Sequence, residues 1–158
     1  MIKYLQLLVV TYILVLNSSA QSATWECIYT DDTGSRYYIN KDSVYLDYHR
    51  NDEIMYHAIF KCNYTDEGRR QLSETFRRNN GYIFSRHNEV SYSIFLEYFK
   101  VNKKAYFAID SEVVFAFDGS IIEDVSYERY YHKWKSMVPG QISFDLAELT
   151  FNYLHRKV

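Results

Sequence analysis

The sequence predicts an α+β fold: an antiparallel sheet of about six strands with a C-terminal helix packed on one face and a side helix. Three observations favour this class. Seventeen tyrosines and ten phenylalanines in 158 residues favour pleated, half-buried strands. Apolar and polar residues alternate in several segments that are separated by turn-forming residues. Two other segments open with acidic residues and close with basic ones, as helices do.

The N-terminal part of the domain is predicted to form strands. Residues 24–40 contain two strand-like runs on either side of the turn-forming stretch 31–34, which indicates a hairpin. A further run follows at 44–48. The first long strand covers 53–64, where the even-numbered positions are apolar, and this period of two is typical of a half-buried strand.

The side helix is predicted at residues 66–80. Thr65 is the expected N-cap, acidic residues occupy the first turn, and arginines occupy the last turn before an Asn-Gly pair. The apolar stripe is narrow and consists mainly of Leu72 and Phe76. We therefore expect an exposed helix that lies on an edge of the sheet.

The second half of the sheet is predicted from three further runs. These strands cover 90–100, 105–117 and 120–127. The middle run is long for one strand, so we expect a β-bulge near Asp110 and Ser111. Asp118 and Gly119 form the strongest two-residue hairpin motif in the chain.

The closing helix is predicted at 143–157, with Ser143 as a capping residue. Pro139, the only proline, precedes Gly140 just before this helix. Proline cannot donate to a strand ladder and glycine permits a sharp turn, so this pair is expected to end the sheet region. Trp134 is then interpreted as a packing residue between the sheet and the helix.

Residues 1–20 are predicted to be a secretory signal peptide that is cleaved after Ala20 or Ala23. The apolar run at 5–16 is shorter than the roughly 20 residues that span a bilayer, so we expect no transmembrane segment in the mature chain. Residues 24–158 are then one domain. We expect an exported protein, in the periplasm, at the cell surface or secreted.

The cysteines are interpreted through this export. Outside a reducing cytosol, two cysteines are usually paired, so a disulfide between Cys27 and Cys62 is predicted. The formal net charge of −2 gives no argument for nucleic acid as a partner.

The sequence contains no catalytic motif. It lacks a nucleophile elbow, a phosphate-binding glycine loop and a dinucleotide fingerprint, and its five histidines have no metal-ligand spacing. We therefore expect no enzyme activity, no metal and no cofactor, with haem as the weaker alternative. Partner recognition remains as the expected role.

Two features are candidate binding residues. Arg70 and Arg77 lie seven residues apart and so share one helix face, which suits an acidic protein or an anionic glycan. The segment 127–134 is rich in aromatic residues, which are favoured at interfaces. Its candidates are Tyr127, Tyr130, Tyr131 and His132. The alternatives are that the arginines are merely solvated and that the aromatic side chains cover the sheet.

The order of these elements resembles the surface-adhesin protein E-like family of Gram-negative bacteria. The resemblance rests on short motifs: "YYINKDSV", "KCNY", "FDGSII" and the closing "KWKSMVPGQISFDLAELTFNY". Its marker residues are Trp25, Asp118, Gly119, Trp134, Pro139 and Gly140. The resemblance implies an antiparallel sheet with a C-terminal helix. It carries over no binding residue, because the shared positions are turns, caps and core.

The best-known member of that family is an adhesin for host matrix and plasma proteins and has been linked to haem. The resemblance therefore implies an exported, non-enzymatic binding module, in particular a bacterial surface adhesin that contacts host extracellular-matrix proteins. Two alternatives stay open: a periplasmic small-molecule carrier of the haem type, and an envelope accessory protein.

Overall fold

The structure is a computed structural model that describes residues 24–80, 86–126 and 134–156. The strands are β1 (Trp25–Thr30), β2 (Arg36–Asn40), β3 (Tyr45–Arg50), β4 (Glu53–Asn63), β5 (Val90–Val101), β6 (Ala105–Ala116), β7 (Ile121–Ser126) and β8 (Lys135–Ser136). The helices are α2 (Asp66–Asn80) and α3 (Ile142–Arg156), and two short 3₁₀ helices are η1 (Lys41–Ser43) and η2 (His87–Glu89).

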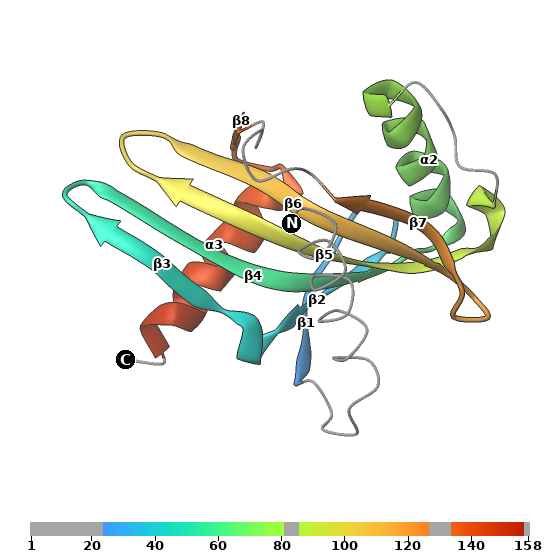
Figure 1. Ribbon diagram of the computed structural model, residues 1–158, viewed down its shortest axis with the longest axis horizontal. Helices are drawn as coiled ribbons and strands as arrows, with labels where there is room; N and C mark the ends of the chain where they lie inside the picture. Colours follow the sequence, from blue (N-terminus) through green and yellow to red (C-terminus); the bar gives the residue numbers. More distant parts are fainter. Residues whose placement is uncertain (1–23, 81–85, 127–133, 157–158) are drawn as a thin grey trace, which may run out of the picture.

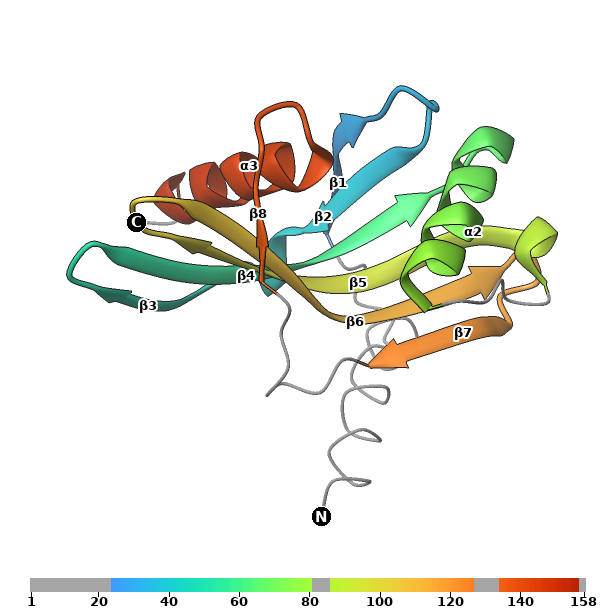
Figure 2. The same cartoon turned by 90° about the horizontal axis from the view of Figure 1, so that it is seen from above.

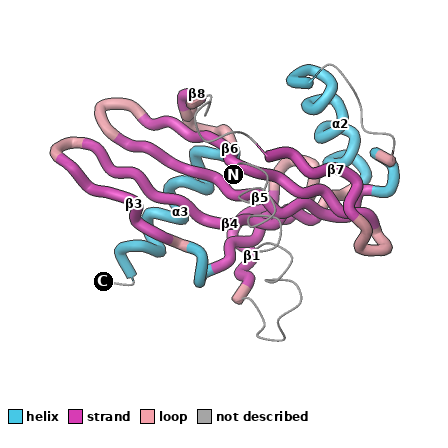
Figure 3. Tube along the Cα trace, in the orientation of Figure 1, coloured by secondary structure: helices cyan, strands magenta, loops and turns pink. Residues whose placement is uncertain are grey.

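The eight strands form one antiparallel sheet in the order β1-β2-β4-β5-β6-β7 (Figures 1 and 3). Two strands lie off this path, with β3 beside β4 and β8 beside β6. The α+β prediction is confirmed, as are the closing helix and the side helix. The sheet has eight strands rather than about six. The strand that no predicted run covers is the two-residue β8, which pairs with β6.

Both helices lie on the same side of the sheet (Figure 2). α3 lies toward the end where the β3–β4 and β5–β6 hairpins turn, and α2 lies toward the other end (Figure 1). Under α3, the large side chains of Tyr56, Phe60 and Phe99 are fully buried, and Leu146 and Ala147 of the helix join their cluster. This cluster is the main core.

The opposite face of the sheet carries a smaller apolar cluster. Ile59, Ile94, Val113 and Phe115 are its buried members, and Trp25 packs against them. The sheet therefore has apolar residues on both faces. This explains why large apolar residues occur at both odd and even positions of β5 and β6.

The predicted bulge lies in β6. Leu96 is opposite Ser111 while the next residue, Glu97, is opposite Ile109, so Asp110 is the extra residue of the ladder. This confirms the expected irregularity. The polar side chains at the bulge, those of Asp110 and Ser111, are both buried.

The predicted start of α2 is confirmed. Thr65 Oγ1 accepts a hydrogen bond from the backbone N–H of Gly68 at 3.1 Å, which is the expected N-cap interaction. The same hydroxyl donates to the carbonyl oxygen of Thr33 at 2.8 Å and so ties the helix to the β1–β2 turn. The helix also covers more of the sheet than an edge position implies, because Phe76 is buried against Val90 and Val114.

The turn before α3 is also confirmed. The N–H of Gln141 donates to the carbonyl of Val138 at 3.0 Å, and Gly140 has a φ of +84°, a conformation that favours glycine. The capping prediction for Ser143 is wrong, because the helix already begins at Ile142. The Ser143 side chain is buried and hydrogen-bonds the carboxyl group of Glu97 instead.

The predicted disulfide is absent: Cys27 and Cys62 are both free thiols. Cys27 is opposite Tyr38, whereas Cys62 is opposite Tyr37. Directly opposed residues share a face and successive residues alternate, so the two cysteines lie on opposite faces of the sheet. They are also separated by the whole of β2, a spacing of about 10 Å, whereas a disulfide needs Cα atoms within about 7 Å.

Candidate functional site

The groove beside α2 is the candidate site that contains both predicted arginines. It lies along α2 and η2 and has a volume of about 590 Å³. We call it the α2 groove; it is lined by Asp66, Arg69, Arg70, Ser73, Glu74, Arg77, His87 and Asn88. Its helix residues follow a spacing of three and four, which places them on one face of α2.

Arg69 fixes the floor of the α2 groove. Its Nη1 lies 3.4 Å from the carbonyl oxygens of both Tyr64 and Val90, and its guanidinium lies 5.1 Å above the ring of Phe117. Its side chain is 17 % exposed and also pairs with Asp66. These contacts join α2 to the start of β5, so Arg69 has a structural role.

Arg70 is held by neighbouring acids. Its Nε and Nη2 donate to the two carboxylate oxygens of Glu67 at 3.0 and 2.6 Å, and its Nη1 lies 3.7 Å from Glu74. These hydrogen bonds lower the pKa of Glu67, which stays ionised. Exposed pairs of this kind contribute little to stability, so Arg70 can exchange its partner at small cost.

Arg77 is the available cation of the α2 groove. Its side chain is exposed, and it forms no ion pair with an acidic residue of the described chain. Its neighbour Arg78 does not line the groove and instead lies 3.5 Å from Glu74. A guanidinium offers five donors in a planar fork, which matches a carboxylate.

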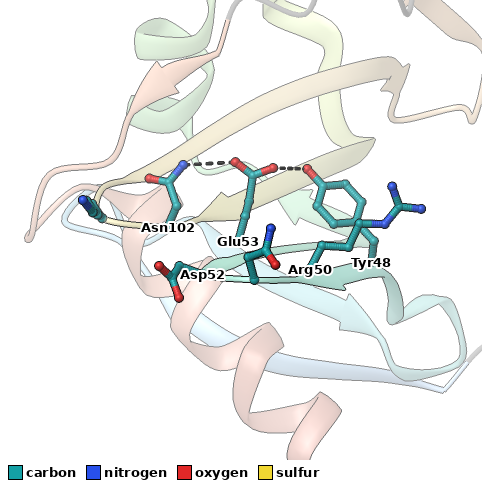
Figure 4. A pocket seen from close by; sticks show the side chains of 7 residues that line it. Tyr48, Arg50, Asp52, Glu53 and Asn102 are labelled. Carbon is teal, nitrogen blue, oxygen red and sulfur yellow. Dashed lines mark hydrogen bonds between the residues drawn. The ribbon is translucent and has the colours of Figure 1, made fainter.

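A second cavity lies between the tips of the β3–β4 and β5–β6 hairpins and has a volume of about 690 Å³ (Figure 4). We call it the hairpin-tip pocket; it is lined by Tyr48, Arg50, Asn51, Asp52, Glu53, Asn102 and Lys103. Sequence analysis missed this pocket. Both of its segments are turn-like in sequence, and nothing in either one shows that the two tips lie side by side.

Two buried carboxyl groups lie on the helix-covered face of the sheet. Glu97 is 1 % exposed and Glu112 is 9 % exposed. Burial raises the pKa of Glu97 to about 8 and that of Glu112 to about 6. One oxygen of Glu97 has no hydrogen-bond partner within the described structure. Neither group lines the α2 groove or the hairpin-tip pocket, so we assign them to the pH dependence of stability rather than to a binding site.

The aromatic candidates Tyr127, Tyr130, Tyr131 and His132 lie outside the described residues. The marker residues have structural surroundings: Asp118 Oδ1 accepts from the backbone N–H of Ser120 at 2.9 Å, and Gly119 has a φ of +81°. The ring of Trp134 lies 4.6 Å from the ammonium of Lys100. Lys100 follows the core residue Phe99 in β5, so this contact is on the face of the sheet opposite to the helices and not between the sheet and α3.

Across residues 24–80, 86–126 and 134–156, no three histidine, cysteine, aspartate or glutamate side chains are grouped so that they could hold a metal ion. In the same ranges, neither helix has the length and apolar character needed to cross a membrane. Comparison of the chain with protein-family models, curated proteins and solved structures yields no match.

Proposed function

We propose that this protein is an exported, non-enzymatic binding module and that its α2 groove binds an acidic segment of a protein partner. The observation that carries the proposal is the exposed guanidinium of Arg77, which has no acidic partner among the described residues and shares a groove with Arg70. An incoming carboxylate gains a charge-assisted hydrogen bond there without displacing an existing ion pair.

The charges around Arg77 support an acidic partner. The groove is lined by three arginines and two acidic residues, which gives it a formal charge of +1 (3 − 2) without His87. The whole chain has a formal charge of −2, so the groove has the opposite sign of charge to the protein as a whole. Local complementarity of this kind favours encounter with the correct partner and discourages others.

A host extracellular-matrix protein is the partner class that we favour. This choice rests on the resemblance of the sequence to the surface-adhesin protein E-like family. A protein of the bacterial envelope is the alternative partner, and surface exposure on intact cells would separate the two.

The direct test measures binding of residues 24–158 to two probes, a poly-L-glutamate peptide and immobilised extracellular-matrix proteins. Arg77→Gln is expected to weaken binding about tenfold, because one charge-assisted hydrogen bond is lost. Arg78→Gln is the matched control: it removes the same charge from the adjacent position of the same helix, outside the groove.

If both variants lose the same amount of affinity, the loss reflects net charge alone, and the groove is not the binding site. If the protein binds poly-L-glutamate but no matrix protein, the groove remains a site for acidic segments and the protein is not an adhesin for the matrix. Raised salt should weaken the interaction with either probe. The distance over which exposed charges attract each other is about 8 Å at physiological ionic strength, and it becomes shorter as the salt concentration rises.

A further inference from the structure

We propose that the hairpin-tip pocket is a second binding site and that its ligand is a neutral saccharide. The pocket lies at the end of the sheet opposite to α2 (Figure 1). It shares no lining residue with the α2 groove. Ligand binding by the pocket can therefore be tested independently of the function proposed for the groove.

The floor of the pocket is organised before any ligand arrives (Figure 4). The carboxylate of Glu53 accepts one hydrogen bond from the hydroxyl of Tyr48 and another from Asn102 Nδ2 at 3.1 Å. These three side chains come from β4, from β3 and from the β5–β6 turn. The amide orientation of Asn102 is itself fixed, because its Oδ1 accepts from the backbone N–H of Lys104 at 2.9 Å. Preorganisation of this kind lowers the entropy cost of binding.

Glu53 remains an acceptor in this network. The hydrogen bonds from Tyr48 and Asn102 lower the pKa of its carboxyl group, so the group stays ionised at neutral pH. A carboxylate has about four lone-pair sites, and only two are used by the neighbouring side chains. The remaining sites can accept hydrogen bonds from a ligand.

The lining of the pocket carries equal numbers of positive and negative charges. Arg50 and Lys103 contribute two positive charges, and Asp52 and Glu53 contribute two negative charges, so the lining has a formal charge of zero (2 − 2). Asn51 has a φ of +52° at the tight turn between β3 and β4 and adds a side-chain amide, which both donates and accepts. A ligand of either charge would meet as many like charges as opposite ones.

A polyhydroxylated ligand fits this pattern best. Each hydroxyl donates one hydrogen bond and accepts two, so neighbouring hydroxyls can satisfy alternating carboxylates, amides and cations. The volume of about 690 Å³ lies within the usual range for small-ligand sites and suits one or two sugar rings. The ring of Tyr48 adds an aromatic surface among the polar groups, and the guanidinium of Arg50 lies over it, 6.0 Å from the ring centroid.

The experiment uses residues 24–158 and saturation-transfer NMR with three neutral probes: methyl α-D-mannopyranoside, methyl β-D-galactopyranoside and chitobiose. Sodium glucuronate and glucosamine hydrochloride serve as charged comparisons. At least one neutral sugar is expected to bind with a Kd of about 1 mM, the range of a small, open site. Asp52→Asn and Asn102→Ala are each expected to weaken that binding about tenfold.

Lys104→Ala is the matched control, since this turn residue does not line the pocket and its backbone N–H remains. Asp52 is exposed in a turn, so Asp52→Asn tests the site even if Asn102→Ala unfolds the hairpin. Three outcomes would overturn the proposal: no saturation transfer to any neutral sugar, equal transfer with the pocket variants, or tighter binding of a charged sugar than of every neutral one.

Discussion

The phenolic hydroxyl of Tyr56 donates a hydrogen bond of 3.0 Å to the backbone carbonyl of Ala147, joining the middle of β4 to the middle of α3. Both residues are buried, at 2 % and 5 % exposure. The ring of Tyr56 also packs against Phe99 of β5 and Phe151 of α3. This polar contact therefore lies inside the apolar core and fixes where along the sheet the helix lies.

Tyr56→Phe is expected to lower the free energy of unfolding by about 1 kcal/mol, because the ring is kept and one buried hydrogen bond is lost. Urea denaturation measures the change. Tyr45→Phe is the control, since Tyr45 is 53 % exposed on β3 and the same hydroxyl is removed without a buried bond. A loss of equal size in both variants would show that the Tyr56–Ala147 bond contributes nothing specific.

Glu97 makes stability depend on pH. Besides burial, Ser143 of α3 and the carboxyl of Glu112 on β6 act on the pKa of its carboxyl group. The charge of Glu97 in turn raises the pKa of the Tyr56 hydroxyl on β4. The pKa of Glu97 is raised from 4.5 to about 8 by burial, so the folded state holds a proton that the unfolded state releases above its ordinary pKa. The contribution of Glu97 is complete at low pH and is lost as pH rises towards 8.

The expected decline in unfolding free energy is about 1 kcal/mol per pH unit within this window, because one proton separates the two states. Glu112, whose pKa is raised to about 6, adds to the decline only at its acidic end. Glu97→Gln should flatten the profile between pH 6 and 8 and make the variant more stable than the parent at pH 8. An unchanged slope in the variant would contradict the role of Glu97.

Gly68 lies where the first turn of α2 meets the β1–β2 turn. A Cβ atom at this position would lie 2.1 Å from Ser35 Oγ, and Ser35 is fully buried. In a free helix, alanine is more favourable than glycine by about 1 kcal/mol. Overpacking typically costs 1–3 kcal/mol, so we expect Gly68→Ala to destabilise the protein on balance.

Thermal unfolding measures this loss. The double variant Gly68→Ala, Ser35→Ala should recover part of it, because the clashing oxygen is gone while the Ser35 Cβ is already at an ordinary distance of 3.4 Å. If Gly68→Ala alone raises the melting temperature, the two turns are less closely packed than the structure indicates.

Local sequence patterns predicted those parts of the fold that local physics determines. The helix bounds at 66–80, the bulge at Asp110 and the Asp118-Gly119 turn depend on caps, lengths and turn residues that are close together in sequence. The burial of Glu97 could not be predicted in this way. In β5 the alternation places Glu97 on the same face as Phe95 and Phe99, and only the docking of α3 makes that face the core.

The candidate site shows the same division. Arg70 and Arg77 were found from their spacing on one helix, and both line the α2 groove. That Arg70 is paired while Arg77 is available depends on the positions of Glu67 and Glu74 around the helix. The hairpin-tip pocket requires two hairpins to be neighbours in the sheet, and strand order is not a local property of the sequence.

The two cysteines give the last prediction. Because Cys27 and Cys62 lie on opposite faces of the sheet with β2 between them, the folded protein should contain two thiols and no disulfide. Cys27 is exposed and should react with a thiol reagent in the native state. Cys62 should react only on unfolding, because burial raises its pKa to about 12 and shields it.

Titration with Ellman's reagent before and after denaturation, without reductant, measures this difference. Cys27→Ser should remove the fast reaction and Cys62→Ser should leave it, while neither change should alter mobility on a non-reducing gel. The absence of any reactive thiol in the denatured, unreduced protein would mean that the cysteines are paired after all. That result would require β1 to leave its place beside β2, because no side-chain rotation can bring the two sulfurs through the sheet.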